Sequence, residues 1–132
     1  MKTELQEKIF NDFPTLFRYK PKKGEPFLPI VFGLECGNGW FDLIYDLCKE
    51  ITELDKEGKV LVHQVKEKFG GLRFYIGIGT DEVFDAIHKA EEKSYKICEA
   101  CGKEGKTRGG GWIYTLCDEC NRLKDEGKRI FG

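Results

Sequence analysis

Three features are scarce or missing in this sequence, and each absence excludes a class of protein. No run of about 18 apolar residues occurs, so the sequence predicts no membrane-spanning helix. Residues 1–10 mix acidic and basic side chains and lack the apolar centre of a secretory signal, which favours a cytoplasmic protein. The formal net charge is only −1, so attraction to nucleic acid or an anionic membrane would need a local basic patch.

The residues that are present suit a globular α+β protein. The 132 residues include ten phenylalanines, five tyrosines and two tryptophans, enough large apolar side chains for a core that needs no metal. We expect helices packed on a β-hairpin or small antiparallel sheet, followed by a C-terminal treble-clef zinc finger. The expected boundary separates an α+β domain at residues 1–97 from the finger at residues 98–132.

Hydrophobic periodicity predicts three helices in the first of these domains. Residues 3–12 form one helix before Pro14, and residues 40–54 form the clearest helix, which ends at Gly58. Thr80 is expected to cap a third helix that continues to the first zinc-finger cysteine. Residues 18–30 contain three prolines and predict an extended connection, and residues 30–32 predict a short edge strand.

A β-hairpin is predicted for residues 60–68 and 72–78, because both runs are rich in β-branched and aromatic residues. We expect a two-residue turn at Gly70–Gly71, which would place Phe69 opposite Leu72. Apart from Glu67, the expected core face comprises Leu61, His63, Val65, Phe69, Leu72, Phe74, Ile76 and Ile78. The expected opposite face is basic and comprises Gln64, Lys66, Lys68, Arg73 and Tyr75.

Four cysteines predict one structural zinc ion, Zn²⁺, in the last third of the chain. They form two Cys-x2-Cys pairs separated by 15 residues, Cys98 with Cys101 and Cys117 with Cys120. Zinc binds four such thiolates at tetrahedral corners, and four protein ligands leave no open position for a substrate. The alternative, two redox-active dithiols, lacks the βαβ pattern that such motifs need.

The remaining cysteines and the basic residues near the metal ligands allow more than one interpretation. Cys48 is expected to be a small buried hydrophobe, and Cys36 has no assigned role. The basic residues either offset the charge of about −2 on a zinc–tetrathiolate centre or bind an anion. They are Lys103, Lys106, Arg108, Arg122 and Lys124.

The sequence offers no recognisable catalytic motif, so we expect a protein that is not an enzyme. Residues 105–107 resemble the end of a P-loop, but Ala100 stands where its leading glycine belongs. A zinc deaminase needs a His-x-Glu sequence, and Val65 occupies the glutamate position after His63. Treble-clef nucleases need histidines in the finger, and residues 98–132 contain none. His63 and His88 are both expected to be structural.

Four segments together resemble a group of small uncharacterised proteins common in phage and prophage genomes. They are ECGNGWFDLI (residues 35–44), QVKEKFGGLRFYI (64–76), CEACGKEG (98–105) and GWIYTLCDEC (111–120). The resemblance spans roughly residues 33–121. It implies a phage-associated origin, the host cytoplasm as the location, and a zinc-bearing α+β fold. The group often has histidine as its last ligand where this chain has Cys120, and either residue binds zinc.

Two functions are compatible with these features. The first is a non-enzymatic binding protein for an anionic ligand, either nucleic acid or a nucleotide signal of host defence that a counter-defence protein would sequester. Its candidate ligand-binding residues are Lys66, Lys68, Arg73, Tyr75, Arg108 and Trp112. The alternative is a protein-interaction adaptor or an inhibitor of a host enzyme, with Trp40, Trp112 and Tyr114 as anchors. The oligomeric state stays open, a homo-oligomer included.

Overall fold

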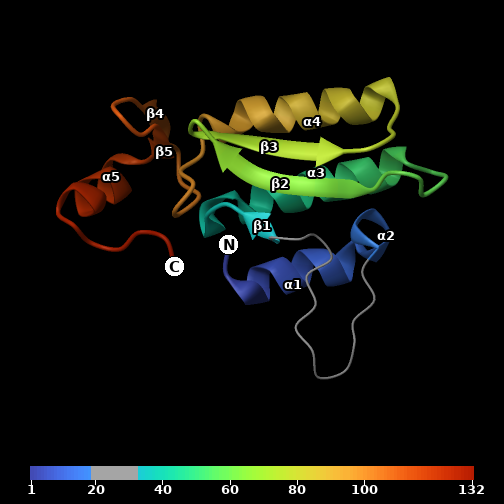
Figure 1. Ribbon diagram of the computed structural model, residues 1–132, viewed down its shortest axis with the longest axis horizontal. Helices are drawn as coiled ribbons and strands as arrows, with labels where there is room; N and C mark the ends of the chain where they lie inside the picture. Colours follow the sequence, from blue (N-terminus) through green and yellow to red (C-terminus); the bar gives the residue numbers. More distant parts are fainter. Residues whose placement is uncertain (19–32) are drawn as a thin grey trace.

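The computed structural model describes residues 1–18 and 33–132 (Figure 1). The predicted edge strand and all but the first residue of the predicted proline-rich connection lie outside these residues. In chain order the elements are α1 (Thr3–Asp12), α2 (Pro14–Phe17), β1 (Leu34–Glu35), the 3₁₀ helix η1 (Asn38–Trp40), α3 (Phe41–Leu54), β2 (Val62–Lys68), β3 (Gly71–Ile76), α4 (Asp81–Ser94), β4 (Lys106–Arg108), β5 (Tyr114–Leu116) and α5 (Asp118–Asp125).

The predicted α+β fold is confirmed, with two small sheets. β1, β2 and β3 form one sheet in that order, with β1 parallel to β2 and β2 antiparallel to β3. The second sheet pairs β4 with β5. We call residues 1–18 and 33–97 the body and residues 98–132 the finger. Figure 1 shows the finger at one end of the body, beside the tip of the β2–β3 hairpin.

The body is held by an apolar core in which the helices cover one face of the sheet. Ile44 and Ile51 of α3 are fully buried in the same cluster as Val65 of β2 and Leu72 of β3. Trp40, at the start of α3, is also fully buried. The apolar spacing in residues 40–54 therefore predicts the buried face of α3 correctly.

Helix α4 lies along the free edge of β3 and satisfies part of its backbone. The Leu72 N–H donates to Ser94 Oγ at 2.9 Å, and the Phe74 N–H donates to Glu91 Oε2 at 3.0 Å. The predicted N-cap of this helix is confirmed, since Thr80 Oγ1 accepts from the Val83 N–H at 3.3 Å. The helix closes an edge that would otherwise expose unpaired strand groups.

The predicted hairpin turn at Gly70–Gly71 is wrong by one position. The turn residues are Phe69 and Gly70, with φ of 53° and 82°, and Lys68 pairs with Gly71. Both values suit the tight turns that join antiparallel strands. Gly71 instead serves packing, because a Cβ there would lie 2.4 Å from the ring of Tyr95. Leu72 consequently pairs with Glu67 and not with Phe69.

A second part of the predicted hairpin is wrong because β2 contains a bulge. The register shifts between Val62 and Gln64, so that Val62 is buried and His63 is exposed. An extra residue in one strand reverses the side-chain alternation beyond it, which no residue pattern in this segment reveals. Phe69 and Ile78 also leave the predicted core, with 65% and 79% of their surfaces exposed.

Neither histidine is buried in the body. His63 follows the bulge just described, and His88 lies on the exposed side of α4. Within the described residues no helix has the length and apolar character needed to cross a membrane.

Candidate metal centre and ligand-binding surfaces

The four predicted metal ligands form one compact thiol cluster. The Sγ atoms of Cys98, Cys101, Cys117 and Cys120 all lie within 4.8 Å of one another, and none forms a disulfide. Cys101 Sγ lies 3.6 Å from Cys117 Sγ. A tetrahedral zinc with Zn–S bonds of about 2.3 Å separates its sulfurs by about 3.8 Å. The cluster therefore has the size and the donors to coordinate one metal ion.

Backbone geometry explains how the first pair of cysteines reaches the cluster. Cys98 and Cys101 lie on a tight knuckle, where the Cys98 N–H donates to the Lys103 carbonyl at 2.7 Å and the Gly102 N–H to the Cys98 carbonyl at 2.9 Å. Gly102 has φ of +84°, a conformation that favours glycine. Gly102 thus allows the backbone to turn sharply after the second ligand, Cys101.

The second pair of cysteines uses the start of α5. Cys117 is the N-cap of this helix, and its Sγ accepts from the Cys120 N–H at 3.4 Å. Burial alone would raise the pKa of Cys117, but this N–H and the neighbouring thiols lower it to about 7. The N–H at this helix N-terminus favours the thiolate form of Cys117, which is the form that binds a metal. Knuckle, β4–β5 hairpin and α5 together form the predicted treble clef.

The two other cysteines do not belong to the thiol cluster. Cys36 and Cys48 are buried in the body core. Burial raises the pKa of the Cys36 thiol to about 12 and raises that of Cys48 as well. Burial and a raised pKa both disfavour reaction of these thiols, and the expectation that Cys48 is a buried hydrophobe is confirmed.

Most basic side chains near the thiol cluster bind groups within the finger. Arg108 donates from Nη2 to Asp118 Oδ1 at 2.7 Å and from Nε to the Leu116 carbonyl at 3.1 Å. Arg122 forms ion pairs with Glu119 and Glu126 on its own helix. Lys124 lies 5.2 Å from the centre of the Tyr114 ring. These partners favour a structural role over a shared anion site.

The six predicted ligand-binding residues occupy three separate places. Lys66, Arg73 and Tyr75 lie on the sheet face opposite the core, where Lys66 pairs with Arg73 and Gln64 with Tyr75. Lys68 and Trp112 line a hollow of about 400 Å³ at the hairpin tip. The sixth, Arg108, is held at Asp118, away from both groups.

Among the described residues, no carboxylate forms an ion pair within 4.0 Å with Lys66 or Arg73 on the sheet face opposite the core, which we call the open sheet face, or with Lys68 at the hairpin tip. Arg73 donates instead to the Tyr95 hydroxyl at 3.2 Å. Glu35 pairs in register with Lys66, but its carboxylate accepts a hydrogen bond of 3.4 Å from Gln64.

The finger is docked on the body through the glycines of the Cys36–Trp40 turn. The Gly39 N–H donates to the Glu99 carbonyl at 2.8 Å, and the Gly37 N–H donates to Glu99 Oε2 at 2.8 Å. A Cβ on Gly39 would lie 2.1 Å from the Cys98 carbonyl oxygen, so only glycine permits this approach. The paired glycines of the Cys-Gly-Asn-Gly-Trp sequence are the signal that could have identified this contact.

A second contact joins the finger to the hairpin tip. Thr115 Oγ1 of β5 donates to the Gly70 carbonyl at 2.6 Å, and the Glu99 N–H donates to the Thr115 carbonyl at 3.0 Å. Four segments that are far apart in the sequence thus meet at one junction, namely residues 35–44, 64–76, 98–105 and 111–120.

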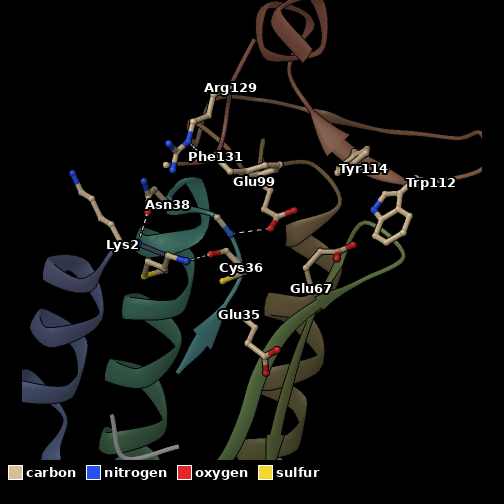
Figure 2. Close-up of a pocket in the computed structure, with 13 residues that line it drawn as sticks. Lys2, Glu35, Cys36, Asn38, Glu67, Glu99, Trp112, Tyr114, Arg129 and Phe131 are labelled. Carbon is tan, nitrogen blue, oxygen red and sulfur yellow. Dashed lines mark hydrogen bonds between the residues drawn. The ribbon is translucent and has the colours of Figure 1, made fainter. Parts of the chain in front are cut away.

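An acidic and aromatic pocket of about 650 Å³ lies at this junction and was not foreseen from the sequence (Figure 2). Its carboxylates come from residues 32 positions apart, Glu35, Glu67 and Glu99, and its rings from the finger. Burial raises the pKa of Glu99 to about 7, and the nearby Glu67 carboxylate also raises it. The Gly37 N–H, which donates to Oε2 at 2.8 Å, acts in the opposite direction and lowers this pKa. Because the residues of this pocket are far apart in the sequence, no local sequence pattern predicts it.

Comparison with known proteins finds no matching family model, no matching curated protein and no matching solved structure.

Proposed function

We propose that this is a zinc-stabilised, non-enzymatic protein whose open sheet face binds an anionic ligand, either a nucleotide or single-stranded nucleic acid. The observation that carries the proposal is the pair formed by Lys66 and Arg73, directly opposite on neighbouring strands and without an ion-pair partner among the described residues. Like charges in such positions repel, and a bound phosphate would relieve that repulsion.

Aromatic groups beside these cations suit the rest of a nucleotide. Tyr75 is 42% exposed on the same face and pairs with Gln64, next to the Lys66–Arg73 pair. A base can stack on an exposed ring while basic side chains contact its phosphate. Tyr95 already accepts a hydrogen bond from Arg73 and so orients the guanidinium. The proposed site is therefore narrower than the six residues expected from the sequence, and it omits Arg108.

Zinc is the metal that the thiol cluster suits best. Four cysteine thiolates at tetrahedral spacing match structural zinc sites, and four protein ligands leave no position for a reacting water. The metal would order the finger and thereby complete the junction with the body. Elemental analysis of the purified protein should give one zinc per chain, and iron in its place would contradict the assignment.

The test of ligand binding compares two double variants. Lys66→Ala with Arg73→Ala should weaken binding of a fluorescently labelled oligonucleotide or a cyclic nucleotide by about tenfold or more. The control, Lys49→Ala with Lys89→Ala, removes two exposed lysines from α3 and α4 and should leave affinity within about twofold. For the oligonucleotide, the slope of log K against log salt should decrease by about 1.4 in the first variant. Equal losses in the two variants would contradict the proposal.

The resemblance to phage proteins suggests a biological role for this binding. We place the protein in the cytoplasm of an infected host, where sequestration of a nucleotide signal would counter host defence. A purified protein that carries such a nucleotide would show a raised ratio of absorbance at 260 to 280 nm. Co-expression with a signal-producing defence system should then restore phage growth, and Lys66→Ala with Arg73→Ala should abolish the effect.

A second candidate function is a protein-interaction adaptor or inhibitor of a host enzyme. It is favoured by Trp112 and Phe69, which are 70% and 65% exposed and line the same hollow at the hairpin tip. Exposed aromatic side chains often anchor protein interfaces. A host protein retained by the wild type and by Lys66→Ala with Arg73→Ala, but not by Trp112→Ala, would favour this function over the first.

A further inference from the structure

The junction between body and finger contains a pocket whose chemistry is opposite to that of the open sheet face. Glu67 projects from β2 and Glu99 from the metal-binding knuckle, and Figure 2 shows both carboxylates entering the same space beside Trp112 and Tyr114. No ion pair within 4.0 Å is formed by Glu35, Glu67 or Glu99 with any residue that the structure describes.

Only one oxygen of the Glu99 carboxylate accepts a hydrogen bond from a described residue, although Glu99 is almost completely buried. Glu99 is 6% exposed, and its Oε2 accepts from the Gly37 N–H at 2.8 Å. Its Oε1 has no hydrogen bond to any described residue, yet it is not sealed from solvent. Glu67 is similar, since one of its oxygens accepts from the Gly70 N–H at 2.7 Å and the other has no such partner. Buried carboxylates with spare acceptor capacity favour a positively charged donor.

The pocket also carries aromatic rings suited to an organic cation. Trp112 and Tyr114 lie with ring centres 6.4 Å apart, and Tyr114 and Phe131 with ring centres 6.3 Å apart. Tyr114 already attracts one ammonium, because Lys124 Nζ lies 5.2 Å from its ring centre. Ring faces beside carboxylates are the usual environment for an alkylammonium group, whereas a bare metal ion would gain little from them.

The cationic groups of the protein itself do not fill this role. The backbone nitrogen of Met1 donates to the carbonyls of Leu34 and Cys36, and Arg129 Nε donates to the Phe131 carbonyl at 2.9 Å. Lys2 also lines the pocket, but Figure 2 shows its side chain extending away from Glu67 and Glu99. The carboxylates thus remain available to a ligand.

From this geometry we infer that the pocket binds a protonated alkylamine between the carboxylates of Glu67 and Glu99, with Trp112 and Tyr114 contacting its methylene groups. The amine belongs either to a free polyamine or to the lysine side chain of a peptide. Both sources offer an ammonium for the carboxylates and an aliphatic chain for the rings, which a pocket of about 650 Å³ accommodates.

Calorimetric titration of the zinc-loaded full chain with spermidine tests the inference. Glu67→Gln with Glu99→Gln keeps the shape of both side chains and their acceptor oxygens for Gly70 and Gly37, and should weaken spermidine binding at least tenfold. The control, Glu4→Gln with Glu92→Gln, makes the same change in net charge at exposed positions of α1 and α4 and should change affinity less than twofold. Matched thermal melting curves establish that each variant is folded.

Two further titrations distinguish the sources of the amine and the role of the rings. The pocket is assigned to a peptide if a short lysine peptide binds more tightly than spermidine and loses this binding when its lysine is acetylated. It is assigned to a polyamine if spermidine binds more tightly than the peptide. Trp112→Ala should weaken the better ligand at least fivefold. The inference is overturned if neither amine binds the wild type, or if the Glu67/Glu99 variant and its control lose affinity equally.

Discussion

The body and the finger are stabilised in different ways, although they belong to one chain. The largest fully buried side chains of the body are apolar and come from both its helices and its sheet, among them Phe10, Trp40 and Leu72. The buried hydrophobic cluster of the finger is only Cys98, Leu116, Cys117 and Cys120, with a single aliphatic member. Such limited apolar burial offsets little of the entropy lost on ordering, so we expect the finger, unlike the body, to depend on a bound metal.

Close backbone contacts join the body and the finger into one structure. Glycines at positions 37 and 39 of the body bring its backbone against the knuckle, and Thr115 of the finger reaches the Gly70 carbonyl. The acidic pocket is formed by this contact, because its carboxylates come from both regions. A metal that orders the finger would consequently also shape this pocket at the surface of the body.

Loss of the metal should have the largest effect and should separate the two regions. Cys117→Ser removes a ligand that also caps α5, so the finger should lose the stabilisation of about 10 kcal/mol that structural zinc typically provides. Limited proteolysis should then cut residues 98–132 while the body survives. Cys48→Ala, a buried body cysteine, should keep one metal per chain. An intact finger in Cys117→Ser would refute the metal dependence.

Gly39→Ala should break the contact between the regions. The new Cβ would meet the Cys98 carbonyl oxygen at 2.1 Å, so we expect a loss of about 3 kcal/mol in the free energy of unfolding. Urea denaturation measures this loss. Gly109→Ala is the matched control, since no atom lies within 4 Å of its added Cβ, and it should leave stability unchanged. Equal effects of the two substitutions would show that the close approach is absent.

Ser94→Ala should weaken the body without affecting the finger. The fully buried Ser94 hydroxyl accepts from the Leu72 N–H, and its removal leaves that donor unsatisfied at a cost of about 2 kcal/mol. The urea midpoint should fall while the chelator concentration that releases the metal stays constant. Thr52→Ala removes a hydroxyl that donates to the Cys48 carbonyl at 2.8 Å on an exposed residue of α3, and should cost less than about 0.5 kcal/mol because no buried donor is left unpaired. A lower metal affinity in Ser94→Ala would contradict the expectation that the body and the finger are stabilised independently.

Arg108→Ala should have the smallest effect and should confine it to the finger. Its partner Asp118 is 87% exposed, so solvent screening keeps the ion pair weak. The same substitution should leave oligonucleotide affinity within about twofold, since Arg108 lies away from the open sheet face. A loss of oligonucleotide affinity as large as that of Lys66→Ala with Arg73→Ala would indicate that Arg108 belongs to the ligand site.

The parts of this molecule that sequence patterns predict are those set by local chemistry. The Cys-x2-Cys spacing predicts the thiol cluster, Thr80 predicts the cap of α4, and apolar periodicity predicts the buried face of α3. Alternation along β2 and β3 also assigns Lys66 and Arg73 to one face, because an error of two residues in pairing preserves which side each residue faces.

The parts that could not be predicted depend on tertiary contacts. Gly71 resembles a turn residue in the sequence, but the ring of Tyr95, 24 positions away, is what requires glycine there. The bulge that exposes His63 has no local residue signal. The junction pocket combines Glu35, Glu67 and Glu99, whose proximity follows only from the docking of the finger.

Thiol labelling with and without a chelator tests most directly the claim that a metal holds the finger while an apolar core holds the body. With metal bound, an alkylating reagent should modify none of the four finger cysteines. After chelation, peptide mapping should find Cys98, Cys101, Cys117 and Cys120 modified within minutes and Cys48 still protected, because its thiol is fully buried and its pKa is raised by that burial. Finger cysteines that stay protected in chelator, or a Cys48 that reacts as fast as they do, would contradict the account.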